Sequence, residues 1–185
     1  MKLKIFKFKK INSTNDTAIR IIKTTNNKSG IVIAERQKKG RGKYGKRWKS
    51  YKGNLFVTIF FSIKKVKLSL KQLTKINCLL VKKLISHFYK GNIVIKSPND
   101  LLIKKKKISG ILQETIIRSG EYIIIIGIGI NLIKNPKIKN YPTTSILNLT
   151  SVKVSSNIAI SKLKKIYERF IPILHKFDVK NINKI

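Results

Sequence analysis

Two neighbouring segments, ISGILQETII at residues 108–117 and YIIIIGIGI at residues 122–130, decide the fold class. Both are typical of β-strands, and only a few residues separate them, so they are expected to pair through a short turn. Two shorter apolar segments, at residues 93–95 and 101–103, precede them. Several strands therefore follow one another closely in the second half of the chain.

The rest of the chain alternates strands with helices. Strands are predicted at residues 2–8, 30–34 and 55–63, and helices at about 13–22, 69–91 and 157–170, with Pro172 disturbing the end of the last one. Residues 36–53 are predicted to form a long loop. This order predicts an α+β fold, a mixed β-sheet flanked by helices, rather than a doubly wound parallel sheet. The length of 185 residues suits a single domain spanning 1–185.

The net charge is extreme, at +35, from 42 Lys and Arg against 7 Asp and Glu. A hydrophobic content of 42% excludes a disordered basic tail. The charge suggests nucleic acid, an anionic membrane or an acidic partner. However, 36 Lys, 34 Ile and 15 Asn, all with codons rich in A and T, also indicate general compositional bias. The cationic runs at residues 64–67 and 104–107 are predicted to be solvated turns.

Cysteine and histidine are scarce. The single cysteine, Cys78, excludes an internal disulfide and fits a reducing cytoplasm. His87 and His175 lie far apart in sequence, which argues against a zinc site. The N-terminus lacks the continuous apolar stretch of a signal peptide, and the most apolar run, residues 122–133, is too short to span a bilayer. The protein is expected to be soluble and cytoplasmic.

The segment GRGKYGKRW at residues 40–48 is the clearest candidate for binding an anion. It matches G-x-G-x-x-G, but no acidic residue lies between Glu35 and Asp100, so the dinucleotide-binding reading fails. It also resembles a P-loop, but Arg47 stands where Ser or Thr would hold magnesium. Glycine backbone and cations together can still line an anion-binding loop. The alternative is a mobile basic surface loop.

Three further segments could carry chemistry. In KSPND, residues 96–100, Asp100 could hold magnesium beside a nucleotide, although a plain turn is the default. In KISGILQE, residues 107–114, Lys107 could reach an anionic substrate near the bare backbone of a glycine. In GIGIN, residues 127–131, glycines within a strand indicate close approach of a ligand or of another chain segment.

Taken in order, these motifs resemble the catalytic domain of the biotin–protein ligases over roughly residues 10–150. The motifs are S-T-N at 13–15, the glycine–arginine–glycine loop, P-N-D at 98–100, K-x-x-G-I-L at 107–112 and G-x-G-I-N at 127–131. The resemblance implies the fold that this superfamily shares with class II aminoacyl-tRNA synthetases. It also implies a two-step reaction: biotin and MgATP form biotinyl-5′-AMP, and the biotin then passes to one lysine of a biotin carboxyl carrier protein, such as that of acetyl-CoA carboxylase. A homodimer is possible, and neither specific DNA nor a membrane is expected as a partner.

The same resemblance implies the roles of individual residues. Lys107 and Arg41 would be catalytic, and Asp100 would hold magnesium. Biotin would be bound by Ser13, Thr14, Asn15, Gln37, Gly40, Arg41, Lys107, Gly110, Leu112, Gly127 and Ile130. ATP or the adenylate would be bound by Arg41, Lys43, Gly45, Trp48, Asn99, Asp100, Lys107 and Asn131.

The sequence departs from the family pattern at three points. Ser97 stands where the family has tryptophan, which puts the packing behind the nucleotide site in doubt. The chain is also expected to lack the N-terminal winged-helix domain and a full C-terminal β-domain.

Two other functions compete. One is a lipoate or octanoate ligase or transferase of the same superfamily, and the other, from a different class, is a basic nucleic-acid-binding domain.

Overall fold

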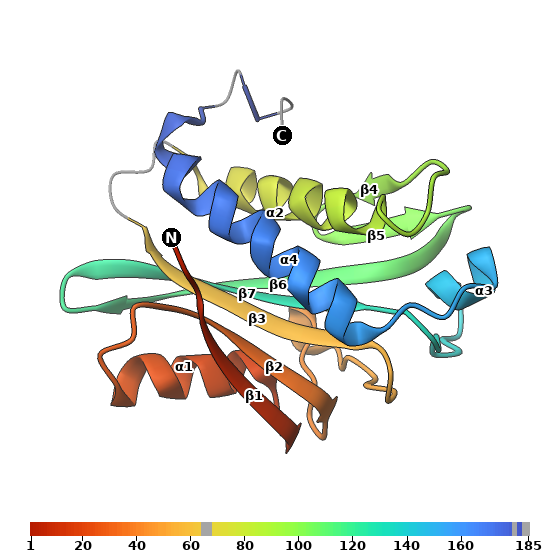
Figure 1. The fold of residues 1–185 in the computed structure, drawn as a ribbon, viewed down its shortest axis with the longest axis horizontal. Coiled ribbons are helices and arrows are strands. Elements are labelled where there is room, and N and C mark those ends of the chain that lie inside the picture. The colour runs from red at the N-terminus through yellow and green to blue at the C-terminus, as the bar shows by residue number, and fades with distance from the viewer. Residues whose placement is uncertain (64–67, 179–180, 183–185) are drawn as a thin grey trace.

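The computed structural model describes residues 1–63, 68–178 and 181–182. Figure 1 shows a twisted sheet with helices on both of its faces. The strands are β1 (Lys4–Ile11), β2 (Ser29–Gln37), β3 (Leu55–Ile63), β4 (Val94–Lys96), β5 (Asp100–Ile103), β6 (Lys106–Arg118) and β7 (Glu121–Ile130). The helices are α1 (Thr14–Thr24), α2 (Leu70–Ile85), α3 (Ile146–Thr150) and α4 (Ser156–Phe170), with short 3-10 turns η1 (Lys43–Gly45) and η2 (Ile171–Lys176).

All seven strands form one mixed sheet in the order β1-β2-β3-β7-β6-β5-β4. Only β1 and β2 pair in parallel, and α1 connects them, as a parallel pair requires. Strand β7 pairs with β6 over its whole length, from Ile130 opposite Ser109 to Glu121 opposite Arg118. The mixed α+β sheet that the sequence predicts is therefore confirmed.

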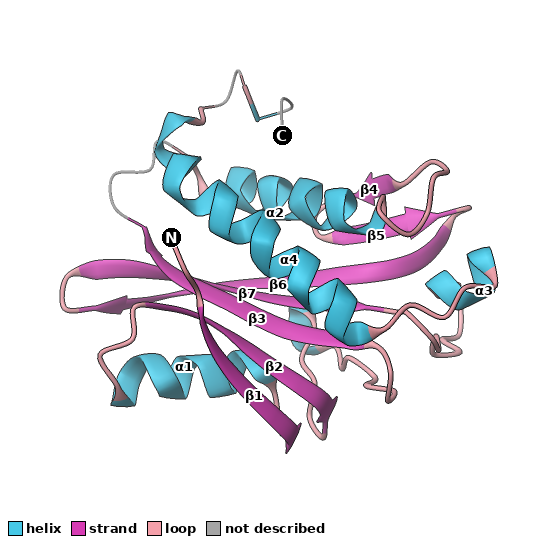
Figure 2. Cartoon of the chain, viewed as in Figure 1, coloured by secondary structure: helices cyan, strands magenta, loops and turns pink. Residues whose placement is uncertain are grey.

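The two faces of the sheet have separate cores. Figure 2 shows α2 and α4 lying over one face, and α1 lies against the opposite face. Successive residues of β7 alternate between these cores: Ile124 and Ile126 pack beneath α2 and α4, whereas Ile123 and Ile125 pack against α1. The near-continuous isoleucine run is explained by this burial on both sides.

Most predicted elements are confirmed, with shifted ends. The strand at 55–63 matches β3, and Ser69 begins α2 with a capping box in which Gln72 is the partner. Helix α2 ends at Ile85, so Phe88 lies beyond it rather than on its face. The α-helical geometry of α4 gives way to a 3-10 turn at Ile171, beside Pro172, as expected.

Three details differ from the sequence expectations or lie beyond them. The short helix α3 was not predicted; its N-cap is Ser145, whose hydroxyl accepts a hydrogen bond from the N–H of Asn148. The turn expected at residues 104–107 is confirmed only for 104 and 105, because β6 begins at Lys106. The turn expected at 64–67 lies outside the described residues. Within the part of the chain that is described, no helix is long and apolar enough to cross a membrane.

Candidate functional site

The residues singled out in the sequence gather on the face of the sheet that carries α1. The start of α1, the end of β2 and the middle of β3, β6 and β7 meet there. Side chains of the loop between β2 and β3 contact each of these elements except β3. Strand alternation explains the choice of residues, because Gly110, Leu112 and Glu114 are spaced by two on β6. Gly127 and Gly129 are likewise two residues apart on β7 and face the same side of the sheet.

The start of α1 is joined to the end of β2. Ser13 is the N-cap of α1, and its hydroxyl accepts a hydrogen bond from the N–H of Asp16 at 3.3 Å. Both the N–H and the hydroxyl of Thr14 donate to Oε1 of Gln37, at 2.8 and 3.1 Å. Nε2 of Gln37 donates to the hydroxyl of Ser50 in the loop. Three of the residues predicted to bind biotin are thus brought together.

Asn15 is buried, and its side chain is fully used within the protein. Its Nδ2 donates to the carbonyl of Leu112 and to the Glu114 carboxylate, and its Oδ1 accepts from the hydroxyl of Thr58 at 2.6 Å. A Cβ on Gly127 would lie 3.0 Å from Cγ of Asn15 and closer still to its Oδ1. Gly127 is therefore bare because the Asn15 side chain occupies that space.

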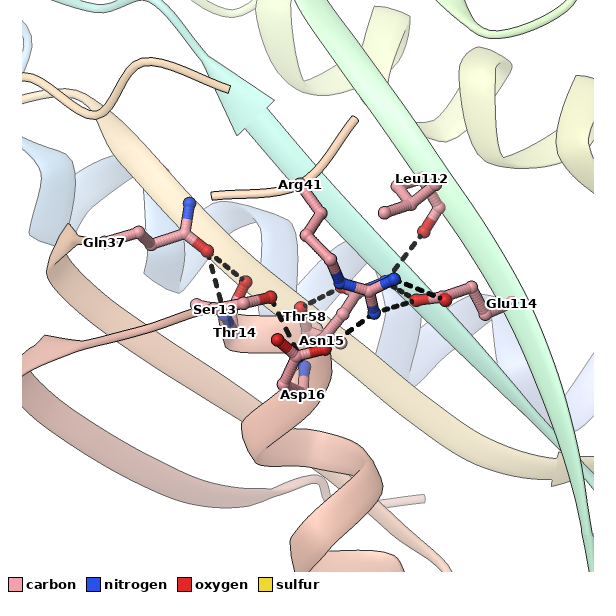
Figure 3. A network of polar contacts seen from close by, with 9 residues as sticks. All are labelled: Ser13, Thr14, Asn15, Asp16, Gln37, Arg41, Thr58, Leu112 and Glu114. Atoms are coloured by element: carbon pink, nitrogen blue, oxygen red, sulfur yellow. Dashed lines mark hydrogen bonds and ion pairs between the residues drawn. The ribbon is translucent and has the colours of Figure 1, made fainter. Parts of the chain in front are cut away.

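Arg41 is held by two carboxylates, as Figure 3 shows. Its Nη1 and Nη2 donate to the two oxygens of Glu114 at 2.9 and 2.8 Å, a bidentate pair. Nη2 also lies 2.8 Å from Oδ1 of Asp16. Partial burial opposes the charge on Arg41, but the hydrogen bonds and negative charges of Glu114 and Asp16 prevail and raise its pKa.

The glycine-rich loop has its own hydrogen bonds. The N–H of Gly42 donates to the Lys46 carbonyl at 2.6 Å, and the N–H of Trp48 donates to the Gly40 carbonyl at 2.8 Å. Gly45 has a φ of 69°, which glycine adopts without strain. These bonds and the Arg41 ion pairs give the loop several contacts with itself and with α1 and β6. Lys43 remains at the outer side, with Nζ 5.0 Å from the centre of the Tyr44 ring.

Trp48 packs against the backbone of three glycines. A Cβ on Gly110 would lie 2.9 Å from Cζ3 of the indole, and a Cβ on Gly129 would lie 2.9 Å from Nε1 and closer still to Cε2. A Cβ on Gly40 would likewise lie 3.3 Å from Cβ of Trp48. The indole Nε1 is buried and has no hydrogen-bond partner among the described residues. It is therefore a donor available to a ligand or to water.

Lys107 and Asp100 form an ion pair beside Trp48. Nζ of Lys107 lies 2.7 Å from Oδ1 of Asp100, and both side chains are less than one-fifth exposed. Oδ2 of Asp100 accepts a hydrogen bond from the Tyr141 hydroxyl at 2.6 Å. Burial, together with this hydrogen bond and the negative charge of Asp100, raises the pKa of Tyr141. Nζ of Lys107 also lies 5.5 Å and 5.4 Å from the ring centres of Trp48 and Tyr141.

The two predicted asparagines lie on either side of β6, Asn99 just before β5 and Asn131 just after β7. Nδ2 of Asn99 donates to the carbonyl of Ile111 at 2.6 Å, which leaves its Oδ1 as the free end. Nδ2 of Asn131 donates to the carbonyl of Thr144, while its Oδ1 is buried without a partner in the described part of the chain. A buried acceptor of this kind calls for a donor that the described residues do not supply.

The side chain of Ile130 points away from the site. Ile130 is 1% exposed and packs in the core beneath α2 and α4, on the far face of the sheet. Strand alternation turns this side chain away from the site, so the prediction that Ile130 binds biotin can concern only its backbone. Its backbone forms the end of β7, between β3 and β6.

Sequence reasoning missed five residues that complete the site. Thr58, Ser50 and Tyr141 were not predicted, and no local pattern marks them. Asp16 and Glu114 had a readable signal, because they are two of only seven acids and adjoin the motifs at residues 13–15 and 107–112.

The sequence is similar to a known protein family and to individual characterised proteins. The profile of the Biotin/lipoate A/B protein ligase family matches residues 7–131. The chain is 32% identical over 108 residues to the bifunctional ligase/repressor BirA of Escherichia coli, covering 57% of this chain and 34% of that protein. It is 32% identical over 132 residues to BirA of Bacillus subtilis, covering 68% of this chain and 39% of that protein.

The fold has solved counterparts as well. The biotin protein ligase of Leishmania major in complex with biotinyl-5-AMP superposes with a TM-score of 0.79 at 24% identity, covering 98% of this chain and 78% of that one. The chain spans little more than a third of the length of the two curated relatives it matches.

Proposed function

Because the chain belongs to the biotin/lipoate A/B protein ligase family, we propose that it is an ATP-dependent biotin–protein ligase. In the first step, a carboxylate oxygen of biotin attacks the α-phosphorus of ATP, the bond to the β-phosphate breaks, and pyrophosphate leaves. In the second step, the amine of a carrier lysine attacks the carbonyl carbon of biotinyl-5′-AMP. The bond to AMP breaks, AMP leaves, and the amine loses its proton as the amide forms.

The observation that carries this proposal is the setting of Lys107. The first step brings two anions together, and a fixed cation must offset their repulsion and the charge that develops on the phosphate. Nζ of Lys107 is only partly exposed, close to the bare backbone of Gly110 and to Trp48. The backbone of Lys107 is itself fixed, since its N–H donates to the Pro142 carbonyl and its carbonyl accepts from Thr144.

The remaining residues divide into a biotin side and a nucleotide side. The start of α1 with Gln37 offers hydrogen-bonding groups for the ureido head of biotin. The glycines of β6 and β7 let Asn15 and Trp48 pack against the sheet, and these two side chains would line the same pocket. On the nucleotide side, the buried Oδ1 of Asn131 is an acceptor without a partner in the described residues. We assign the nucleotide to the neighbourhood of Asn131, Asn99, Trp48 and Lys107, with Lys43 and Gly45 of the loop beside it. Holding both reactants in line supplies much of the remaining rate.

Magnesium is the metal that such a reaction implies, and Asp100 is the residue that would hold it. Mg²⁺ is commonly bound by one or two carboxylates together with substrate phosphates. Both oxygens of Asp100 are engaged, by Lys107 and Tyr141, and the described residues contain no group of three or more Asp, Glu, His or Cys suited to a metal. The protein therefore fits an ion held mainly by ATP. Its chemistry would be to neutralise phosphate charge.

The partner in the second step is a biotin carboxyl carrier protein of a carboxylase such as acetyl-CoA carboxylase. The net charge of +35 favours an acidic carrier. We place the reaction in the cytoplasm, in keeping with the buried free thiol of Cys78. We propose that the residues of this chain act as one catalytic domain, as a monomer or as a homodimer.

Biotin has to be distinguished from lipoate, because the family includes ligases for both. The relatives named as biotin ligases favour biotin. The strand residues Phe56, Phe60 and Phe61, at most 3% exposed, cannot stack on bases, which weakens the case for a nucleic-acid-binding function. The test is to incubate the purified protein with MgATP and either radiolabelled biotin or lipoate and to separate the products. Biotinyl-5′-AMP alone is expected, whereas lipoyl-AMP alone would transfer the assignment to the rival substrate.

A further inference from the structure

Asn54 lies just before β3, at the point where the ladder between β3 and β7 ends. Leu55, the first residue of β3, pairs with Ile130, the last residue of β7. Continuing this antiparallel register would set Asn54 opposite Asn131. Asn54 is 3% exposed and Asn131 is 1% exposed. Two buried asparagines therefore meet beyond the end of the ladder.

The Asn54 carboxamide bonds the backbone that the ladder leaves. Its Oδ1 accepts hydrogen bonds from three consecutive N–H groups, those of Leu132, Ile133 and Lys134, at 3.1, 2.9 and 3.1 Å. Its Nδ2 donates to the carbonyl of Lys134 at 2.6 Å. Both ends of the carboxamide are thus used on one stretch of chain. A single side chain fixes the backbone that directly follows Asn131.

The backbone of Asn131 is held on three sides, and Asn54 supplies one of them. The N–H of Asn131 donates to the Ile108 carbonyl at 2.9 Å, and its carbonyl accepts from the N–H of Ile146 at 3.0 Å. The next N–H along the chain, that of Leu132, donates to Asn54. Because the rotamer of a side chain depends on the backbone that carries it, the direction of the Asn131 carboxamide depends on these bonds.

We propose that Asn54 is a positioning residue for the nucleotide and acts through Asn131. It keeps Nδ2 of Asn131 on the carbonyl of Thr144 and keeps Oδ1 in the place assigned to the nucleotide. The hydrogen bonds of Asn54 run to residues 51 and 132–134, whereas the biotin side lies at the start of α1. The consequence for catalysis rests on the proposed function. The effect on the Asn131 side chain does not.

The test compares two buried asparagines. Asn54→Ala removes the carboxamide beside Asn131. Asn77→Ala is the matched control, because Asn77 is also 3% exposed and its carboxamide bonds Gln113 and Tyr167 on the face that carries α2 and α4. Each variant loses a buried, hydrogen-bonded carboxamide, so a loss of stability alone does not distinguish them. Only Asn54→Ala is expected to change the nucleotide side.

The first measurement follows the Asn131 side chain by NMR in protein without substrate. Its NH2 group is bonded to the Thr144 carbonyl, and its exchange with water is measured by saturation transfer. We expect this exchange to be about fivefold faster in Asn54→Ala and to stay within about twofold of wild type in Asn77→Ala. Equal exchange in wild type and Asn54→Ala, or equal acceleration in the two variants, would overturn the proposal.

If Asn54→Ala does not fold, Asn54→Ser decides. The serine hydroxyl is shorter and cannot reach all three N–H groups, so the same exchange is expected to be about twofold faster. A folded Asn54→Ser in which the Asn131 NH2 group exchanges as in wild type would refute the proposal.

The second measurement is the kinetics of adenylate formation. Asn54→Ala is expected to raise the KM for ATP about fivefold and to change the KM for biotin less than about twofold. Equal increases for both substrates, or the same ATP effect in Asn77→Ala, would contradict the proposal, because a loosened fold does not select one substrate. If the unaltered protein forms no biotinyl-5′-AMP, the proposed function fails, while the NMR measurement still decides whether Asn54 positions Asn131.

Discussion

Removing the Lys107 ammonium is the perturbation that best separates chemistry from stability. In Lys107→Met the side chain keeps its apolar length against Trp48 and Tyr141, but Asp100 loses its cation at 2.7 Å. The pair is less than one-fifth exposed, so the cost lies between that of a surface pair and that of a fully buried one, about 2 kcal/mol. For a chain of this size, that corresponds to a fall in Tm of about 4–8 °C.

The double variant Lys107→Met/Asp100→Asn makes this argument testable. It removes the unpaired negative charge, so it is expected to recover at least half of the lost Tm. Adenylate formation is expected to stay at least about 100-fold below wild type in both variants, because neither restores the fixed cation. The control is Lys106→Met, the neighbouring exposed lysine, which is expected to match wild type in Tm and in rate.

The assays are differential scanning calorimetry and formation of biotinyl-5′-AMP from labelled biotin with MgATP. Adenylate formation within threefold of wild type in Lys107→Met would refute the catalytic assignment. A Tm that fails to recover in the double variant would refute the energetic role given to the Lys107–Asp100 pair.

Three further changes test other parts of the structure. Gly129→Ala places a methyl group within the Trp48 indole, so we expect at least tenfold slower adenylate formation with a loss of stability under about 1 kcal/mol, measured by urea unfolding, because the loop can move aside; unchanged activity would contradict the packing. Asn54→Ala leaves three backbone N–H groups near β7 without the side-chain oxygen that accepts them, and should cost about 3 kcal/mol in the same unfolding assay. Glu168 has a lowered pKa because its hydrogen bonds, including the one from the Leu3 N–H at 2.7 Å, outweigh burial, so its contribution is present at neutral pH and lost as pH falls through that pKa. Glu168→Gln should therefore lower stability by about 1 kcal/mol at pH 7, and a difference from wild type that does not shrink as the pH falls below about 4.3, the ordinary pKa of a glutamate, would contradict this.

The strands could be predicted because their patterns are strong and local. The apolar patterns at residues 55–63 and 122–130 predict strands even when the pairing partners are not known. Ser69 with Gln72 predicts the start of α2. The helix α3 escaped prediction because five residues give too short a pattern. Its start depends on Ser145, one of many serines that could serve as a cap.

The candidate site could be predicted only where its residues lie in motifs. Lys107 and Asp100 were identified separately, but their ion pair depends on the irregular register between β5 and β6, which sequence does not reveal. Tyr141 reaches Asp100 across 41 positions, so no local pattern joins them. The side-chain direction of Ile130 could not be predicted, because the motif fixes the order of residues and not which face of the strand each occupies.

The central claim is that this chain transfers biotin to a carrier, and the most direct measurement is the mass of the carrier. A biotin carboxyl carrier domain is incubated with the protein, biotin and MgATP, and intact-mass and peptide mass spectrometry follow. We expect a gain of one biotin on a single lysine, retained with Lys106→Met and lost with Lys107→Met. No gain with the unaltered protein, or a gain only when lipoate and a lipoyl domain replace biotin and its carrier, would contradict it.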